Sequence, residues 1–362
     1  MSKLLLHEFH EKLGAHFQTV NGAEVVSDYG NTTAEYTALN DTTAILDLSF
    51  RSRICLTGTD RVRFLHGQVT NDITRLRPGE GCYAALTTSK GRMESDLNIY
   101  QLKDELLLDF EPGLAQTVSQ RLEKYIVSDD VQMVDVSTFY GVLSVQGPKA
   151  AEVLRGAELA KEVPTKPFTF IEISDATHGE IYVMNQPRLR GTGFDLFIPN
   201  AALEGMARKL VSSANSSGGT LAGWAAFETA RIEAGIPRFG ADMDETNIPI
   251  ECGIEARAIS YNKGCYIGQE VLNRIHTLGH VNKSLRGLRL TDDLKSLPVK
   301  GDKLFHDGKE VGCVTSAAVS PKLKANIALA YIRREVDQDG TELVLRSQDT
   351  ETPAKVETFF AI

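Results

Sequence analysis

The chain lacks several features that would place it in a specialised class of protein. No apolar run reaches the length of about 18 residues that a membrane-spanning helix needs. The first apolar run, Leu4-Leu5-Leu6, is too short for the core of a signal peptide, so we expect a cytoplasmic protein. Low-complexity tracts and internal repeats are also absent from the sequence. An ordinary soluble globular protein is therefore expected.

Positive charge is in deficit. The 39 lysine and arginine residues face 48 aspartate and glutamate residues, which gives a formal net charge of −9. Because a negative surface repels phosphate backbones and anionic lipids, we expect neither nucleic acid nor membrane as a partner. A local basic pocket for a small anionic ligand is still compatible with this charge.

Cysteine is scarce and scattered. The five cysteines are odd in number, widely spaced and never arranged as C-x-x-C, which is typical of proteins from a reducing compartment. Without paired cysteines, a zinc site or a self-contained iron–sulfur cluster is not expected, and we predict no metal ligands. The cysteines are Cys55, Cys82, Cys252, Cys265 and Cys313.

With 362 residues, the chain is too long for one ordinary core, and its length predicts two or three domains. Helices and strand-like runs in the segment 53–137 predict an α+β unit, including a helix from Pro112 to about Val127. A second unit begins at the strand Tyr140–Val145. From about Ser284, short strands separated by turns predict a small terminal β-barrel.

Two helices are predicted within the second unit. Asn200 is expected to cap a helix that runs to about Ser213, since asparagine commonly accepts a hydrogen bond at a helix start. A further helix is predicted from Trp224 to Glu233, before a glycine and a proline end it.

The segment 263–270 combines a cation, a thiol, two glycines and two polar side chains. A positive charge at Lys263 can stabilise a thiolate at Cys265, and the dipole of a helix starting near Gly268 adds to that effect. The alternative is a structural turn into a helix from Gln269 to Ile275, with Cys265 as a small buried hydrophobe. The segment reads Lys263, Gly264, Cys265, Tyr266, Ile267, Gly268, Gln269 and Glu270.

This segment resembles the signature of the YgfZ proteins, which are folate-binding relatives of the T-protein (aminomethyltransferase) of the glycine cleavage system. The resemblance extends over nearly the whole chain, including the blocks Thr70-Asn71-Asp72 and Gln146-Gly147-Pro148. It implies an α+β cloverleaf of three domains around a central folate channel, closed by a C-terminal β-barrel. The implied domains are residues 1–52 joined to 138–283, an inserted domain 53–137, and the barrel 284–362.

The resemblance also assigns roles to individual residues, and tetrahydrofolate or a one-carbon derivative is the implied cofactor. Asp96 stands where T-proteins place an aspartate beside the reactive nitrogens of the folate, and Arg231 where an arginine pairs with its glutamate tail. The alternatives are a solvated acid for Asp96 and, for Arg231, a salt bridge to Glu228, Glu233 or a nearby acid on the same helix. Asp195 is the candidate partner of the pterin, although as a lone acid on a strand it is more often on the surface.

Tyr83 is a candidate wall of the folate pocket, with core packing as the alternative. The complete motif 263–270 favours a factor that aids assembly or repair of iron–sulfur clusters, because aminomethyl transfer does not require a cysteine there. In that function, Cys265 exchanges with the thiol or cluster of an iron–sulfur client or assembly protein. The alternative is a folate-dependent aminomethyltransferase that uses Asp96, and a third possibility is a folate-binding protein without turnover.

Overall fold

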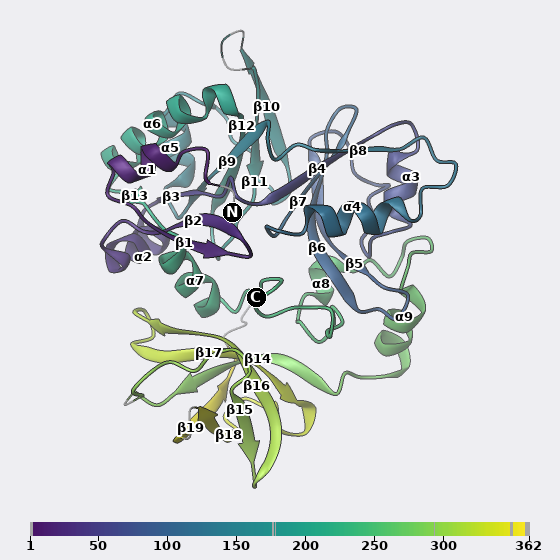
Figure 1. Cartoon of the computed structure of the whole chain (residues 1–362), viewed down its shortest axis with the longest axis vertical. Coiled ribbons are helices and arrows are strands. Elements are labelled where there is room, and N and C mark those ends of the chain that lie inside the picture. The colour runs from purple at the N-terminus through teal and green to yellow at the C-terminus, as the bar shows by residue number, and fades with distance from the viewer. Residues whose placement is uncertain (1–2, 176, 178, 293, 348–349, 359–362) are drawn as a thin grey trace.

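The computed structural model describes residues 3–175, 177, 179–292, 294–347 and 350–358. Within these residues, the strands form a two-stranded hairpin, a six-stranded sheet, a five-stranded sheet and a closed barrel. Figure 1 shows the two larger sheets side by side, with the barrel below them. No helix of the described residues is long and apolar enough to span a membrane.

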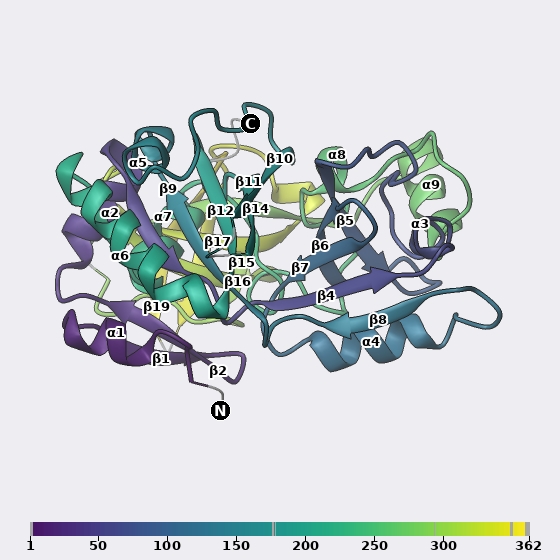
Figure 2. The same ribbon diagram turned by 90° about the horizontal axis from the view of Figure 1, so that it is seen from above.

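The six-stranded sheet has the strand order β10-β11-β12-β9-β3-β13. Its strand β3 comes from the amino-terminal segment and pairs antiparallel with β9, about 100 residues later in the chain. Helices α5 and α6 cover one face, where their apolar side chains share a core with β9 and β12 (Figure 2). The strands are β3 (Ala44–Asp47), β9 (Tyr140–Gln146), β10 (Phe170–Asp175), β11 (Gly179–Asn185), β12 (Gly193–Pro199) and β13 (Thr220–Leu221). The covering helices are α5 (Ala150–Gly156) and α6 (Asn200–Ser216).

Of the amino-terminal elements, β2 and α2 pack with α7 on the other side of this sheet, whereas Phe9 of α1 belongs to the core of α5 and α6. Buried residues of α2 and α7 form one core with β3 and β9. These elements are α1 (His7–Lys12), β1 (His16–Val20), β2 (Ala23–Asp28), α2 (Thr32–Asp41) and α7 (Trp224–Glu233).

The five-stranded sheet is antiparallel throughout, in the order β5-β6-β7-β4-β8. Its core includes apolar side chains of α3 and α4. The elements are β4 (Ser52–Thr57), α3 (Arg61–His66), β5 (Glu80–Thr87), β6 (Met93–Gln101), β7 (Leu106–Phe110), α4 (Ala115–Glu123) and β8 (Gln132–Asp135).

Two short helices, α8 (Glu255–Ala258) and α9 (Gln269–Leu278), lead from this region into the barrel. The barrel closes where β14 pairs with β19, in the order β14-β17-β16-β15-β18-β19. Closure removes the exposed sheet edges that invite aggregation. The strands are β14 (Lys283–Leu290), β15 (Lys303–His306), β16 (Lys309–Ser320), β17 (Ala325–Arg333), β18 (Glu342–Ser347) and β19 (Thr350–Glu357), with a 3₁₀ turn η1 (Arg334–Val336) after β17.

The mixed α and β architecture and the C-terminal barrel confirm the coarse fold prediction. The helix predicted from Trp224 to Glu233 is α7, with the same bounds. Two local predictions are wrong. The helix expected from Pro112 to Val127 is limited to α4, because the chain turns at Gly113 (φ +79°) before the helix begins. Asn200 does not cap α6, since its side chain donates to the carbonyl of Thr138 at 2.6 Å instead.

Candidate functional site

The two large sheets, α7 and α8 contribute side chains to one cavity of about 130 Å³. It has the character of a ligand site, with aromatic walls and a few convergent polar groups. Its polar and charged lining residues are Arg51, Tyr83, Asp96, Asn98, Glu111, Gln186, Arg188, Arg231, Arg238 and Arg257. Its apolar lining residues are Leu48, Phe168, Pro187, Trp224, Phe227, Ile236 and Pro237.

Asp96 is a carboxylate of this cavity with one unused oxygen. Pairing of β5 with β6 sets Ala85 opposite Asp96, so Tyr83, two residues away, lies on the same face of the sheet. The Tyr83 hydroxyl donates to Asp96 Oδ2 at 2.8 Å. Asp96 Oδ1 is buried and accepts no hydrogen bond from the described residues. A buried acceptor without a donor is costly, and the N–H group of a ligand would satisfy it.

The surroundings of Asp96 raise its pKa above that of an exposed aspartate. Burial raises the pKa of Asp96, and the nearby Glu111 carboxylate raises it further, while the Tyr83 hydroxyl and Arg51 oppose the shift. Asp96 therefore takes up a proton at a higher pH than an exposed aspartate does. A carboxyl group of this kind is suited to exchanging a proton with a bound ligand.

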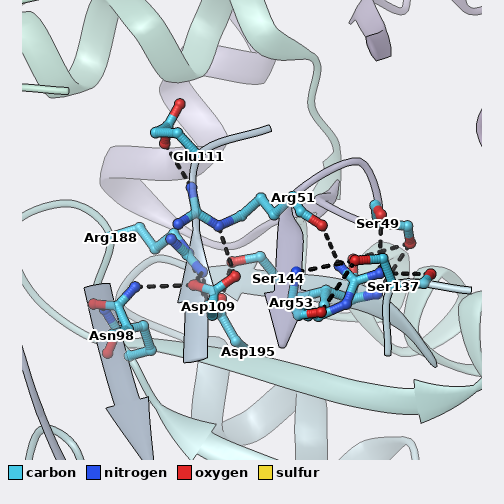
Figure 3. A network of polar contacts seen from close by, with 12 residues as sticks. Ser49, Arg51, Arg53, Asn98, Asp109, Glu111, Ser137, Ser144, Arg188 and Asp195 are labelled. Atoms are coloured by element: carbon cyan, nitrogen blue, oxygen red, sulfur yellow. Dashed lines mark hydrogen bonds and ion pairs between the residues drawn. The ribbon is translucent and has the colours of Figure 1, made fainter. Parts of the chain in front are cut away.

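Arginines and carboxylates alternate in a buried chain (Figure 3), and its member Glu111 lies close enough to Asp96 to affect the pKa of Asp96. Arg188 Nε contacts Asp195 Oδ2 at 2.8 Å, and its Nη2 contacts Asp109 Oδ2 at 2.8 Å. Arg51 Nε contacts the other oxygen of Asp109 at 2.8 Å, and its Nη1 contacts Glu111 Oε1 at 2.6 Å. Each arginine is thus held by two carboxylates, and its charge is already matched within the protein.

The chain of ion pairs continues from the sheets to α7. Arg238 Nη1 contacts Glu111 Oε2 at 2.9 Å, and its Nε contacts Glu228 Oε1 at 3.1 Å. Arg231 contacts Glu228 through Nε at 3.0 Å and through Nη2 at 2.7 Å. Its Nη1 contacts the buried carboxylate of Asp242.

Arg231 lines the cavity, but its guanidinium is fully engaged. Besides the two carboxylates, Nη1 donates to the carbonyl of Ile236 at 3.3 Å and Nη2 to Ser316 Oγ on the barrel at 2.9 Å. These contacts account for all five N–H donors of the side chain. The salt bridge to Glu228, which the sequence offered as the alternative, is present. Pairing of Arg231 with a folate tail stays a prediction.

Asp195 lies behind the cavity and is not among its lining residues. It is fully buried, and burial raises its pKa against the opposing effect of Arg188. Ser144 Oγ donates to its Oδ1 at 2.7 Å, while Arg188 occupies its Oδ2. A direct contact of Asp195 with a pterin stays a prediction, and within the protein this residue orients Arg188.

Aromatic side chains form the walls of the cavity. Phe168, Trp224 and Phe227 line it, and the Arg238 guanidinium lies 5.0 Å from the centre of the Trp224 ring. Phe168 has a backbone φ of +59°, a left-handed conformation that is unfavourable for a bulky residue. Such strain is concentrated at ligand-binding sites. Flat aromatic walls beside a carboxylate suit a planar ligand with N–H groups.

The segment 263–270 lies outside the cavity lining. Lys263 Nζ donates to the carbonyls of His66, Val69 and Asn71 at 2.7, 2.6 and 2.8 Å. Burial lowers the pKa of Lys263 to about 8. Because three carbonyls take its donors, Lys263 ties the segment to the chain that follows α3.

The remainder of the segment is a turn into α9. Tyr266 is buried in the core, whereas Cys265 is exposed, so the alternative of Cys265 as a buried hydrophobe is wrong. Gly268 has φ +91°, and a Cβ there would lie 2.6 Å from the carbonyl oxygen of Thr88. Gln269 Nε2 donates to the carbonyl of Gly264 at 3.4 Å, which closes the turn.

Among the described residues, no group of three His, Cys, Asp or Glu side chains is arranged to hold a metal ion.

The cavity brings together three of the residues selected from the sequence, namely Tyr83, Asp96 and Arg231. The other cavity residues with charged side chains were not predicted from the sequence as site residues. They are Arg51, Glu111, Arg188, Arg238 and Arg257. Arg51 and Arg188 lie in connections between strands, where no periodic pattern marks a residue as buried. Charged residues in such places are usually solvated, so only the fold reveals their pairing.

Fold and cavity together define an α and β protein with a C-terminal barrel and a cavity lined by both of its large sheets. The GCVT N-terminal domain family matches residues 6–263, and the glycine cleavage T-protein C-terminal barrel domain matches residues 283–359. The chain belongs to this glycine cleavage T-protein family.

Proteins named aminomethyltransferase are similar over almost the whole chain. The protein from Lysinibacillus sphaericus is 28% identical over 340 residues, covering 93% of this chain and 91% of the relative. The protein from Bacillus subtilis is 27% identical over 353 residues, covering 97% and 96%. The crystal structure of the glycine cleavage system aminomethyltransferase T from Bartonella henselae has the same fold, with a TM-score of 0.87 at 23% identity, covering 99% and 97% of the two chains.

These findings support the glycine cleavage T-protein family, and they favour the aminomethyltransferase alternative over the iron–sulfur function preferred from the sequence. The relatives bear the name of the alternative function, aminomethyltransferase, and the comparisons give no support to YgfZ membership or to an iron–sulfur role. The preference for iron–sulfur assembly arose from a motif that forms a turn outside the cavity.

Proposed function

We propose that the protein is a folate-dependent aminomethyltransferase, with tetrahydrofolate bound in the cavity around Asp96. The observation that carries this proposal is the carboxylate of Asp96. Its Oδ2 accepts a hydrogen bond from the Tyr83 hydroxyl, while its Oδ1 is buried and has no hydrogen-bond partner among the described residues. The names of the relatives support the same reaction.

The residues of the cavity fit a reduced folate. Its pterin is planar and rich in N–H groups, which match the aromatic walls and the free Oδ1 of Asp96. The cloverleaf arrangement, its central folate channel and the three domain boundaries given above belong to this proposal. So does an aminomethylated carrier protein as the second partner.

Tetrahydrofolate, when bound, supplies the nitrogens that accept the one-carbon unit. Asp96 contributes a carboxyl group that can hold or release a proton at Oδ1 and, when ionised, stabilise positive charge that develops nearby. Tyr83 fixes the orientation of that carboxyl through Oδ2. The buried arginine–carboxylate chain keeps the surrounding dipoles fixed, so little reorganisation accompanies the reaction.

Single-turnover transfer from an aminomethyl-lipoyl carrier protein to tetrahydrofolate tests the proposal. We expect product with the wild type and a loss of at least about a hundredfold in rate with Asp96→Asn, because the amide cannot exchange the proton. The substitution preserves size and leaves an oxygen for the Tyr83 hydroxyl, so folding is expected to persist.

Asp104→Asn is the matched control. Asp104 is exposed in the turn between β6 and β7, and its variant should transfer at the wild-type rate. Absence of product with the wild type, despite measurable binding of tetrahydrofolate, would rule out the transferase.

A further inference from the structure

Arg257 differs from the other arginines of the cavity. Each of the other four is held by two carboxylates, whereas Arg257 has no carboxylate within ion-pair distance among the described residues. Its guanidinium lies 4.5 Å from the centre of the Tyr83 ring, and the side chain is exposed to solvent. The charge of Arg257 is therefore available to a ligand.

The position of Arg257 is fixed by the backbone of α8. Asn71 Nδ2 donates to the Arg257 carbonyl at 3.1 Å, and Thr70 Oγ1 donates to the carbonyl of Ala258 at 2.6 Å. The side chain is thus presented over Tyr83, whose hydroxyl contacts Asp96. An exposed residue that also lines the cavity lies at its mouth.

The size of the cavity indicates which part of a ligand reaches this mouth. A volume of about 130 Å³ is below the roughly 300 Å³ that encloses a drug-sized ligand, so part of a folate would lie outside. With the pterin at Asp96, the emerging part carries the carboxylates of the glutamyl tail. Arginine binds a carboxylate with paired, charge-assisted hydrogen bonds.

We propose that Arg257 binds a carboxylate of the glutamyl tail and thereby sets the preference for folates over ligands without that tail. This inference rests on the proposed function. Arg231 could take that part only by giving up ion pairs with Glu228 and Asp242, and a released Asp242 would remain fully buried without its cation. Arg257 breaks no ion pair when it binds.

Calorimetry with two ligands tests this role. Tetrahydrofolate carries the glutamyl tail, and tetrahydropteroate, used as its primary amide, has the same pterin and benzoyl groups with neither that tail nor a free carboxylate. We expect Arg257→Gln to weaken tetrahydrofolate binding about tenfold to a hundredfold and to leave tetrahydropteroate binding unchanged. Arg257→Lys keeps the charge and should recover part of the loss.

Arg274→Gln serves as control, because Arg274 is exposed on α9 and outside the cavity lining. It should bind both ligands like the wild type. An equal loss for both ligands in Arg257→Gln, or no loss for either, would overturn the assignment to the tail while leaving the proposed function in place. A wild type that binds neither ligand would overturn both.

Discussion

Cys265 has an exposed thiol on a turn, and the ammonium group of Lys263, two residues earlier, is hydrogen-bonded to other groups. Lys263 donates to three backbone carbonyls, so it contributes to the fold of the segment. We expect Cys265→Ala to transfer the one-carbon unit at the wild-type rate and to change the free energy of unfolding by less than about 0.5 kcal/mol, as surface substitutions usually do. Single-turnover kinetics and urea unfolding check both expectations. A large drop in rate would instead place the thiol in the reaction.

Two aspartates show what a sequence can and cannot predict about a site. Asp96 and Asp195 are both candidate folate contacts from the sequence, and both have a raised pKa because of burial. They differ in the fold, since Arg188 and Ser144 occupy both oxygens of Asp195 while one oxygen of Asp96 is unsatisfied among the described residues. That difference depends on where the loop carrying Arg188 lies, which no local pattern reports.

At the scale of elements, Gly268 determines how the turn 263–268 enters α9. Its φ of +91° disfavours any side chain, and a Cβ at this position would lie only 2.6 Å from the Thr88 carbonyl oxygen. We expect Gly268→Ala to lower the free energy of unfolding by more than about 1 kcal/mol, measured by urea denaturation.

Gly205 provides the opposite case for comparison. It lies within α6, and a Cβ there would meet nothing within 4 Å. Gly205→Ala should therefore raise the free energy of unfolding by about 0.5–1 kcal/mol, because alanine loses less conformational freedom in a helix. Equal effects of the two substitutions would show that the turn does not need a glycine.

The elements that the sequence predicted well have strong local patterns. α7 has the predicted bounds, because the glycine before it and the Gly235 and Pro237 after it mark its ends. Strand β3 was not predicted, and its pairing with β9 is a contact between distant segments. Such pairing depends on the tertiary fold, which a single sequence does not display.

At the scale of the whole molecule, the chain of ion pairs joins the two large sheets and α7, and a hydrogen bond extends it to the barrel. It begins at Asp195 in the six-stranded sheet, passes Asp109 in the five-stranded sheet, and ends where Arg231 meets Ser316 of the barrel. Breaking one buried pair leaves a charge without its partner, which costs far more than the loss of a surface pair. Stability should therefore depend on the ionisation of the central carboxylates.

Glu111 is the central link, since it holds both Arg51 and Arg238. Burial opposes its ionisation, but the two arginines outweigh this effect and lower its pKa from 4.5. A lowered pKa in the folded state means that the stabilisation is present above the unfolded value of 4.5 and is lost as pH falls through the folded value. Glu111→Gln should cost about 3 kcal/mol at pH 7, and this difference from the wild type should shrink below about pH 4.5.

Fluorescence of Trp224, the single tryptophan, follows this unfolding in urea because the ring lies against Arg238. Glu204→Gln is the matched control, since Glu204 pairs with Arg208 on the exposed face of α6 and should contribute less than about 1 kcal/mol at any pH. If Glu111→Gln and Glu204→Gln cost the same at pH 7, the buried chain does not couple the sheets. A loss confined to Glu111→Gln that fades in acid would establish that the buried ion pairs of Glu111 with Arg51 and Arg238 stabilise the folded chain.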